Sequence, residues 1–256
     1  MHNKRSLVSI IMPSYNSQDT IGDSIKSVIQ QSFTNWELIV TDDFSTDSSR
    51  YVVESFSAKD KRIKLFSLKK NSGAAKARNN SIRHSSGRYI AFLDADDLWL
   101  EDKLELQIAA MNEYNFSVCY SSYIRFNDSG DQSNIKAKSF LTFDDMLSAN
   151  YIGNLTGVYD ASKLGKFYQN DIGHEDYDMW LRILKKSNAL GISAPLAKYR
   201  VCSDSLSSNI FKGFIWHYSI LKSNTDENTI KIFMRMLTYL LLSLKKRLPK
   251  ISKTPL

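Results

Sequence analysis

The chain has 256 residues and a formal net charge of +7, and 43% of its residues are hydrophobic. This length suits one large domain, or one domain with an appendage, and the composition is ordinary for a soluble globular protein. The two cysteines, Cys119 and Cys202, are too few for a disulfide framework or a zinc site, which favours a reducing compartment.

Apolar runs alternate with amphipathic helices along the first hundred residues. The predicted strands cover residues 7–12, 36–40, 63–68 and 89–93, and the helices begin near residues 19, 45 and 74. The first run is too short for a signal peptide and lacks a small-residue cleavage pattern. Strands that alternate with helices in this way predict an α/β fold with a mostly parallel, doubly wound sheet flanked by helices.

Polar and acidic side chains follow three of these strands. The groups are Pro13 to Asn16 after the first strand, Asp42 and Asp43 after the second, and Asp94, Asp96 and Asp97 after the fourth. Ligands of such sheets bind beyond the carboxyl ends of the strands, so we expect all three groups at one binding edge. The chain has no glycine-rich phosphate loop, which argues against a dinucleotide site, a P-loop and a sugar-phosphate nucleotidyltransferase.

The three acids after the fourth strand predict a metal site. Adjoining carboxylates repel one another, and a divalent cation would offset their charge. Oxygen ligands indicate Mg²⁺ or Mn²⁺, with substrate phosphates completing the metal shell. The alternative is that Asp96 or Asp97 caps the following helix, which would explain one acid but not three. Arg78, on the preceding helix, could reach the same edge or could be a solvated surface residue.

The pattern is looser after residue 100. The predicted elements are a helix over about 101–114, strands over 116–121 and 154–159, and a turn over 127–131. A further helix begins after Gly173 and carries Glu175 and Asp176 at its amino end. Acids at this end of a helix are stabilised by the helix dipole, which is one interpretation. The other is a general base at a helix start.

Residues 209–256 form a basic tail. They include nine basic and two acidic residues, so the whole net charge of +7 lies there and residues 1–208 are neutral overall. A nucleic-acid enzyme would usually carry its basic residues across its working face. The distribution therefore argues against a nucleic-acid partner and favours an anionic membrane surface.

One face of a helix predicted in this tail, over residues 229–248, is apolar. Its residues are Ile230, Phe233, Met234, Leu237, Leu241, Leu244 and Leu248. The apolar core is too short to span a bilayer, but the helix could lie on one. The alternatives are that the face packs on the domain or on a second subunit, which would make a homo-oligomer.

Taken in order, the motifs resemble those of the family 2 inverting glycosyltransferases, which have the GT-A fold. The resemblance covers about the first 205 residues, and its motifs are VSIIMPSYN (8–16), VTDDFSTD (40–47), ARN (77–79), LDADD (93–97) and EDYD (175–178). It implies a GT-A domain over residues 1–208, with a nucleotide-sugar half over about 1–100 and an acceptor half over about 101–208. The basic helical tail, 209–256, would follow this domain.

The resemblance also implies roles for single residues. The side chains implied to bind a nucleotide sugar, usually a uridine one, are Pro13, Tyr15, Asp43, Arg78, Asp94 and Asp96. Asp96 and Asp97 would hold Mn²⁺ or Mg²⁺ on the diphosphate, and Asp176 would be the catalytic base. Glu175 and Asp178 would contact the acceptor or support the site.

The reaction implied by the resemblance is metal-dependent transfer of a sugar with inversion. The processive signature Gln-x-x-Arg-Trp is absent, so we expect single-sugar addition rather than chain synthesis. A catalytic domain with a basic amphipathic tail resembles bacterial enzymes that extend a lipid-diphosphate-linked saccharide for O-antigen or capsule. Such an enzyme would be peripheral on the cytoplasmic face of the inner membrane.

One residue departs from the family pattern. Cys202 stands where many relatives have a His that can join the metal shell, and a thiol is a poor ligand for Mg²⁺. Asp204 or water would take its place, or the carboxylates would suffice. The alternative function is therefore a membrane-docked protein that keeps the nucleotide-sugar pocket with little or no catalysis.

Overall fold

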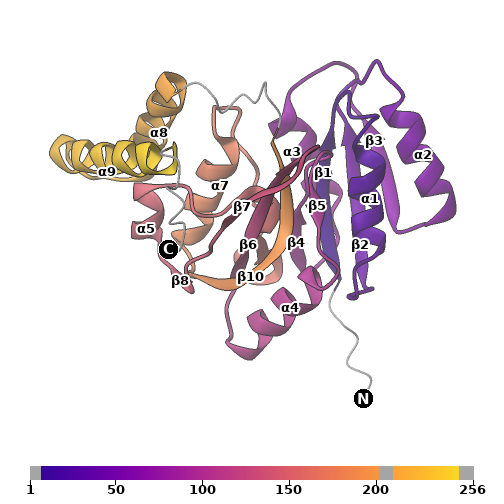
Figure 1. The fold of residues 1–256 in the computed structure, drawn as a ribbon, viewed down its shortest axis with the longest axis horizontal. Helices are drawn as coiled ribbons and strands as arrows, with labels where there is room; N and C mark the ends of the chain where they lie inside the picture. Colours follow the sequence, from indigo (N-terminus) through magenta and orange to yellow (C-terminus); the bar gives the residue numbers. More distant parts are fainter. Residues whose placement is uncertain (1–6, 202–209, 248–256) are drawn as a thin grey trace, which may run out of the picture.

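The computed structural model of the chain describes residues 7–201 and 210–247, which form a sheet flanked by helices (Figure 1). The elements of the first half are β1 (Val8–Ser14), α1 (Ile21–Ile29), β2 (Trp36–Asp42), α2 (Ser49–Lys59), β3 (Ile63–Ser67), α3 (Ala74–His84), β4 (Tyr89–Phe92), β5 (Leu98–Trp99) and α4 (Lys103–Glu113). Those of the second half are β6 (Val118–Asn127), β7 (Gly130–Ile135), β8 (Phe140–Leu141), α5 (Phe143–Ser148), the 3₁₀ helix η1 (Asn154–Thr156), β9 (Val158–Asp160), α6 (Ala161–Leu164), α7 (Glu175–Leu184), β10 (Ala189–Arg200), α8 (Ile210–Asn224) and α9 (Thr229–Arg247).

The order of the strands brings the ends of distant strands to one edge of the sheet. The order is β3-β2-β1-β4-β9-β6-β10-β5, with β7 paired to β6 and β8 paired to β10. β1 is parallel to both β2 and β4, and β6 is parallel to β10. β9 lies antiparallel between β4 and β6, so β4 and β6 run in the same direction. The predicted α/β fold with a mostly parallel sheet is therefore confirmed, and the carboxyl ends of β1, β2, β4, β6 and β10 share one edge.

Two segments of the second half differ from the sequence prediction. The strand expected over residues 154–159 begins as the helix η1, and only Val158–Asp160 is a strand. Gly157, between η1 and β9, lies close to α7: a Cβ atom added to this glycine would be 2.2 Å from the ring of Trp180. The segment Gly130–Ile135, whose first two residues belong to the predicted turn over 127–131, is a polar and mostly exposed strand that pairs with β6 through its backbone. Hydrophobic periodicity cannot detect a strand without a buried face.

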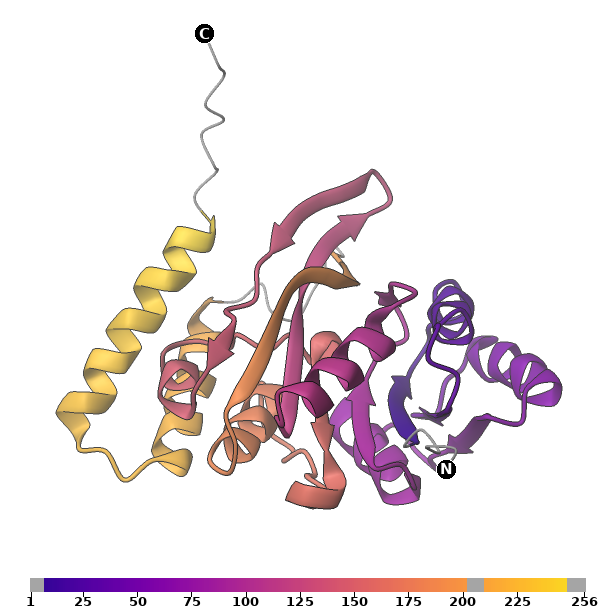
Figure 2. The same ribbon diagram turned by 90° about the horizontal axis from the view of Figure 1, so that it is seen from below.

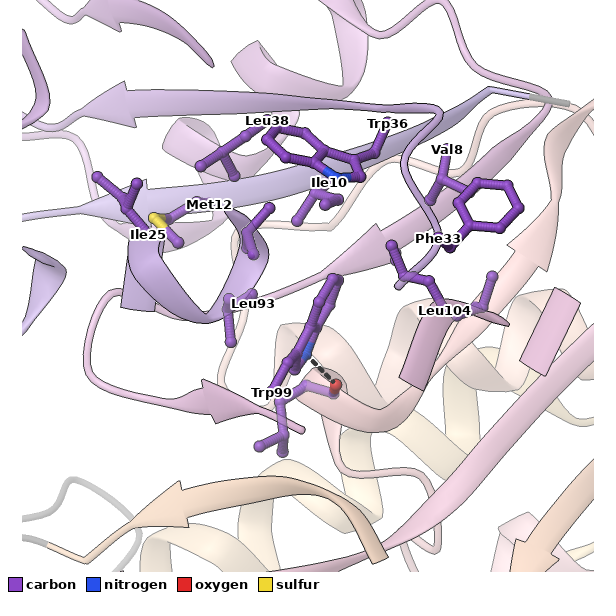
Figure 3. Close-up of a cluster of buried hydrophobic side chains, with 14 of the residues drawn as sticks. Val8, Ile10, Met12, Ile25, Phe33, Trp36, Leu38, Leu93, Trp99 and Leu104 are labelled. Carbon is purple, nitrogen blue, oxygen red and sulfur yellow. Dashed lines mark hydrogen bonds between the residues drawn. The ribbon is translucent and has the colours of Figure 1, made fainter. Parts of the chain in front are cut away.

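Within the described residues, buried apolar side chains form a cluster on each face of the sheet. Ile10 and Met12 belong to one cluster, and Ile11, between them on β1, belongs to the other. This alternation is expected for a strand covered on both faces. Figure 3 shows the first cluster, where Trp99 Nε1 donates a hydrogen bond to the Leu155 carbonyl oxygen at 2.9 Å. Trp99 directly follows the acidic loop after β4, so its burial fixes the end of that loop.

The helices α8 and α9 lie at the opposite end of the molecule from α1 and α2 (Figures 1 and 2). α9 packs against α5 and α8 through Ile232 and Met236, which are buried. The predicted apolar face is a different stripe of the helix, and its five described residues, Ile230, Phe233, Met234, Leu237 and Leu241, are 42–75% exposed. The interpretation that this face packs on the domain is therefore wrong for these residues. The side chain of Leu244, and Leu248, lie outside the described part of the chain.

No helix within residues 7–201 and 210–247 has both the length and the apolar character that a membrane-spanning segment requires.

Candidate active site

The loops after β1 and β2 lie together at the carboxyl edge of the sheet. Asn16 Oδ1 accepts a hydrogen bond from the backbone N–H of Thr46 at 2.9 Å, which joins the two loops. Pro13 is the last but one residue of β1 and pairs in register with Thr41 of β2. Tyr15, just beyond the strand, is 49% exposed. Both residues therefore lie at the predicted edge, and their contact with a nucleotide stays a prediction.

Asp43 holds the turn that leads into α3. Its carboxylate is 3% exposed and accepts two backbone hydrogen bonds, from Ser72 N–H to Oδ1 and from Gly73 N–H to Oδ2, both at 2.7 Å. These bonds connect the end of β2 to the residues just before α3, the helix that carries Arg78. The resemblance implied that Asp43 borders the nucleotide, and this residue also fixes the position of α3.

Arg78 connects the two halves of the predicted domain. Its guanidinium donates from Nη2 to Asp94 Oδ1 at 2.7 Å and from Nη1 to Glu175 Oε1 at 3.1 Å, and Nη1 also reaches Gln169 Oε1 at 3.2 Å. Burial alone would lower the pKa of Arg78, but the charges of Asp94 and Glu175 outweigh it and raise this pKa above its ordinary value. The residue is only 8% exposed, so the interpretation as a solvated surface arginine is wrong.

The end of β10 is hydrogen-bonded to the acidic loop after β4. Asp97 is 1% exposed, and its Oδ1 accepts a hydrogen bond from the backbone N–H of Arg200 at 2.8 Å. The Arg200 side chain donates from Nε to the carbonyl oxygen of Asp96 at 3.0 Å. The loop is followed by β5, and the next helix, α4, has Asp102 as its N-cap residue. The alternative that Asp96 or Asp97 caps a helix is therefore wrong.

A divalent cation fits the acidic loop by the chemistry of its donors. Burial and the charges of neighbouring carboxylates raise the pKa of both Asp96 and Asp97, so the negative charge here is poorly compensated. Mg²⁺ commonly takes only one or two protein carboxylates and completes its shell with substrate oxygens. Among residues 7–201 and 210–247, no three His, Cys, Asp or Glu side chains converge to hold a metal ion by themselves. Cys202 and Asp204 lie outside the described residues.

Asp176 lies in the first turn of α7, one residue after Glu175. Its carboxylate is half-buried, and Oδ2 accepts a long hydrogen bond from Asn150 Nδ2 at 3.4 Å. Burial and the adjacent Glu175 raise the pKa of Asp176, while Arg78 and His174 act in the opposite direction. The carboxylate therefore holds a proton more strongly than an ordinary aspartate and makes few bonds within the protein. Both properties suit a general base.

The carboxylate of Asp178 has different hydrogen-bond partners from that of Asp176. It is buried, and it accepts hydrogen bonds from Asn170 Nδ2 at 2.8 Å, from Arg182 Nε at 2.9 Å and from Asn224 Nδ2 of α8 at 2.9 Å. Of the two roles that the resemblance left open, this geometry favours support of the site over contact with an acceptor.

Two tyrosines that the sequence prediction missed lie near the acidic loop. Tyr123 of β6 and Tyr199 of β10 meet edge to face, with ring centroids 6.2 Å apart. Burial raises the pKa of Tyr199 to about 12, and the charge of Asp97 contributes. Burial also raises the pKa of Tyr123; Arg125 lowers it, and Asp97 and Asp176 both raise it further. The prediction ended the strand at residue 121, whereas β6 continues to Asn127 and carries Tyr123 to the site.

Solved structures with a similar fold show which fold this chain has. The structure of Staphylococcus aureus TarS (residues 1–349) in complex with UDP-GlcNAc aligns with a TM-score of 0.72 at 21% identity, covering 91% of this chain and 71% of that one. The mannosyltransferase PcManGT from Pyrobaculum calidifontis, in complex with GDP-Man and Mn²⁺, aligns with a TM-score of 0.66 at 18% identity, covering 94% and 71%. The fold is therefore the GT-A fold of glycosyltransferases.

Sequence comparison identifies the family. Residues 9–168 match the family described as "Glycosyl transferase family 2". The chain is 41% identical over 242 residues to WfgD of Escherichia coli, named a UDP-Glc:alpha-D-GlcNAc-diphosphoundecaprenol beta-1,3-glucosyltransferase, with 94% of each chain covered. The chain belongs to glycosyl transferase family 2 and is a glycosyltransferase, as the sequence motifs predicted.

Proposed function

We propose that the protein is a metal-dependent, inverting glycosyltransferase that adds one sugar from a UDP sugar to a lipid-diphosphate-linked saccharide in bacterial surface polysaccharide synthesis. The observation that carries the proposal is the bridge from Asp94 through Arg78 to Glu175. It joins the acidic loop of the donor half to the helix start that bears Asp176. The name of the Escherichia coli relative supports inversion, because UDP-glucose is α-linked and the product in that name is β-linked.

The donor half would bind and orient the nucleotide sugar. Pro13 and Tyr15 lie at the edge where the base would rest, and Arg78 holds the Asp94 carboxylate in place. Asp96 and Asp97 would hold Mn²⁺ or Mg²⁺, which supplies stabilisation of the negative charge that develops on the departing diphosphate.

The acceptor half would supply the base. Asp176 would take the proton from an acceptor hydroxyl while that oxygen forms a bond to the anomeric carbon. The bond from the anomeric carbon to the diphosphate oxygen breaks in the same displacement, so configuration inverts without a covalent intermediate. The raised pKa of Asp176 makes it a stronger base than an exposed aspartate.

Calorimetry with a panel of nucleotide sugars, with Mn²⁺ and with chelator, tests the donor site. We expect one UDP sugar, with UDP-glucose as the first candidate, to bind only when metal is present. Asp96→Asn should weaken this binding by about tenfold or more, because a ligand of the metal is lost. Asp23→Asn, on the exposed face of α1, is the matched control. Equal binding with and without metal would contradict the metal role, and no binding of any donor would favour a protein without this pocket.

We further propose that the exposed apolar face of α9 docks on an anionic membrane surface. The acceptor in the relative's name carries a lipid. The face of α9 has five described apolar side chains that are exposed, and the tail to which α9 belongs carries the whole +7 charge of the chain. Each basic residue near anionic lipid contributes about 1 kcal/mol to binding. The protein would thus be peripheral on the cytoplasmic face of the inner membrane.

Vesicle flotation measures this docking. We expect the protein to float with vesicles that contain about one third phosphatidylglycerol, to float poorly with pure phosphatidylcholine, and to be released by high salt. The double change Phe233→Ser and Leu237→Ser should reduce flotation about tenfold, because it removes the centre of the apolar face. Ser223→Ala, on α8, serves as the control. A concentration-dependent dimer that does not float would show instead that this face joins two subunits.

A further inference from the structure

α8 contacts the first turn of α7 and the two residues just before it. Gly173, just before α7, lies so close to Trp216 of α8 that an added Cβ atom would be 2.0 Å from the indole Cδ2 atom. The ring of Trp216 also meets the His174 ring edge to face, with centroids 5.1 Å apart at an interplanar angle of 89°. The corner formed by residues 173–174 therefore rests directly on the indole.

Two more contacts join α8 to the same turn. His217 stacks on Tyr177 with ring centroids 5.1 Å apart and an interplanar angle of 4°. Asn224 donates a hydrogen bond to Asp178, at 2.9 Å. Positions 174, 177 and 178 share one face of a helix because they are three and four residues apart.

Asp176 and Glu175 belong to the other side of this turn. Glu175 contacts Arg78, and Asp176 contacts Asn150. The turn is therefore placed between α8 on one side and the predicted site on the other. A shift of the corner at residues 173–174 would move Asp176, which follows His174 by two residues.

The backbone conformation of His174 requires contacts that hold it in place. It adopts a left-handed backbone conformation, with φ 59° and ψ 46°, at the N-cap position of α7. Non-glycine residues in this region persist where the surrounding structure holds them. The indole of Trp216 covers both the His174 ring and the Cα atom of Gly173, where only a glycine leaves enough room.

We propose that Trp216 is a positioning residue that sets the place of the base Asp176 through the Gly173–His174 corner. This inference rests on the proposed function, in which Asp176 takes the acceptor proton. The tail helices then belong to the acceptor half of the enzyme, because the helix that leads into the membrane-docking face of α9 also holds the base.

The test compares Trp216→Ala and Trp216→Phe in the full chain, with UDP-glucose, Mn²⁺ and α-D-GlcNAc-diphosphoundecaprenol as substrates. We expect Trp216→Ala to lower kcat by about 10- to 100-fold, the usual result of a small misplacement of a catalytic group, with the donor KM unchanged. Trp216→Phe keeps an aromatic ring against the corner and should stay within about threefold of the wild type. Tyr218→Ala, an aromatic truncation on the same helix at a side chain that is 40% exposed, is the matched control.

Gly173→Ala provides a second, independent variant. Alone, it should lower kcat because its methyl group pushes the corner away from the indole. Combined with Trp216→Ala, it should add little further loss, because the group with which it clashes is gone. Fully additive losses in kcat would overturn the proposal.

Hydrogen exchange of residues 173–178 gives a readout that does not depend on activity. Protection of this segment should fall about tenfold in Trp216→Ala and remain unchanged in Tyr218→Ala. Unchanged protection, or a loss of kcat no greater than in Tyr218→Ala, would overturn the positioning role and leave the proposed function intact. Failure of the proposed function would look different, because Asp176→Asn would transfer sugar as well as the wild type if Asp176 were not the base, and the wild type itself would transfer no sugar if the protein were not this enzyme.

Discussion

Replacing Asp176 by Asn should lower kcat for sugar transfer by about 10³-fold, within the range that general bases contribute. Asn has the same shape but cannot accept the proton of the acceptor hydroxyl. Binding of the nucleotide sugar should change by less than about twofold, because the proposed donor contacts lie in the other half of the domain. Transfer assays and donor calorimetry on the same preparation measure the two effects separately.

The pH dependence of sugar transfer provides a second test of Asp176 as the base. A base works only when deprotonated, and the pKa of Asp176 is raised by burial and by Glu175. Transfer should therefore be lost as pH falls through a value above about 3.9, the ordinary pKa of an aspartate. In Asp176→Asn this acid limb should disappear from the residual activity.

Asp171→Asn is the matched control for this variant. Asp171 is exposed and pairs with Lys76 on the surface, so its loss should matter little. If Asp176→Asn transfers sugar as well as Asp171→Asn does, Asp176 is not the base.

Replacing Arg78 by Met should lower the free energy of unfolding by about 3–5 kcal/mol, the usual cost of breaking a buried ion pair. The guanidinium donates to Asp94, Glu175 and Gln169, and the change would leave these acceptors without their donor. Urea unfolding of the variant and the wild type measures the difference.

Two other arginine variants serve as comparisons for Arg78→Met. Arg78→Lys keeps the positive charge, but an ammonium lacks the planar fork that reaches both carboxylates, so an intermediate loss is expected. Arg50→Met removes an exposed i,i+4 pair with Glu54 and should change stability by less than about 0.5 kcal/mol. A loss in Arg78→Met as small as in Arg50→Met would show that the bridge does not hold the two halves together.

The sequence by itself determined the elements of the first half of the chain and the edge of the sheet that carries the predicted site residues. Each strand and helix there buries its own apolar stripe, so hydrophobic periodicity and strand-end residues were enough to predict the alternation. The position of the acids at residues 94–97 could be predicted from this alternation, because parallel strands of one sheet end on the same side. The family was recognisable partly for the same reason, since three of its five motifs, at residues 8–16, 40–47 and 93–97, lie at those strand ends.

Only the tertiary structure decided how the two halves meet. Arg78 is buried because Asp94 and Glu175, which are 16 and 97 residues away along the chain, converge on it. Asp97 is held by the amide of Arg200, 103 residues further on. Periodicity reports only the environment that a segment makes for itself, so it could not separate a buried bridging arginine from a solvated one.

The same reason applies to β7 and to the tail. β7 has no buried face, and its place is set by backbone pairing with β6. In α9 the sequence showed one apolar face, but the residues that pack on the domain are Ile232 and Met236, outside that face. Which stripe of a helix meets the protein depends on the shape and charge of the neighbouring elements. This long-range information has no local signature in the sequence.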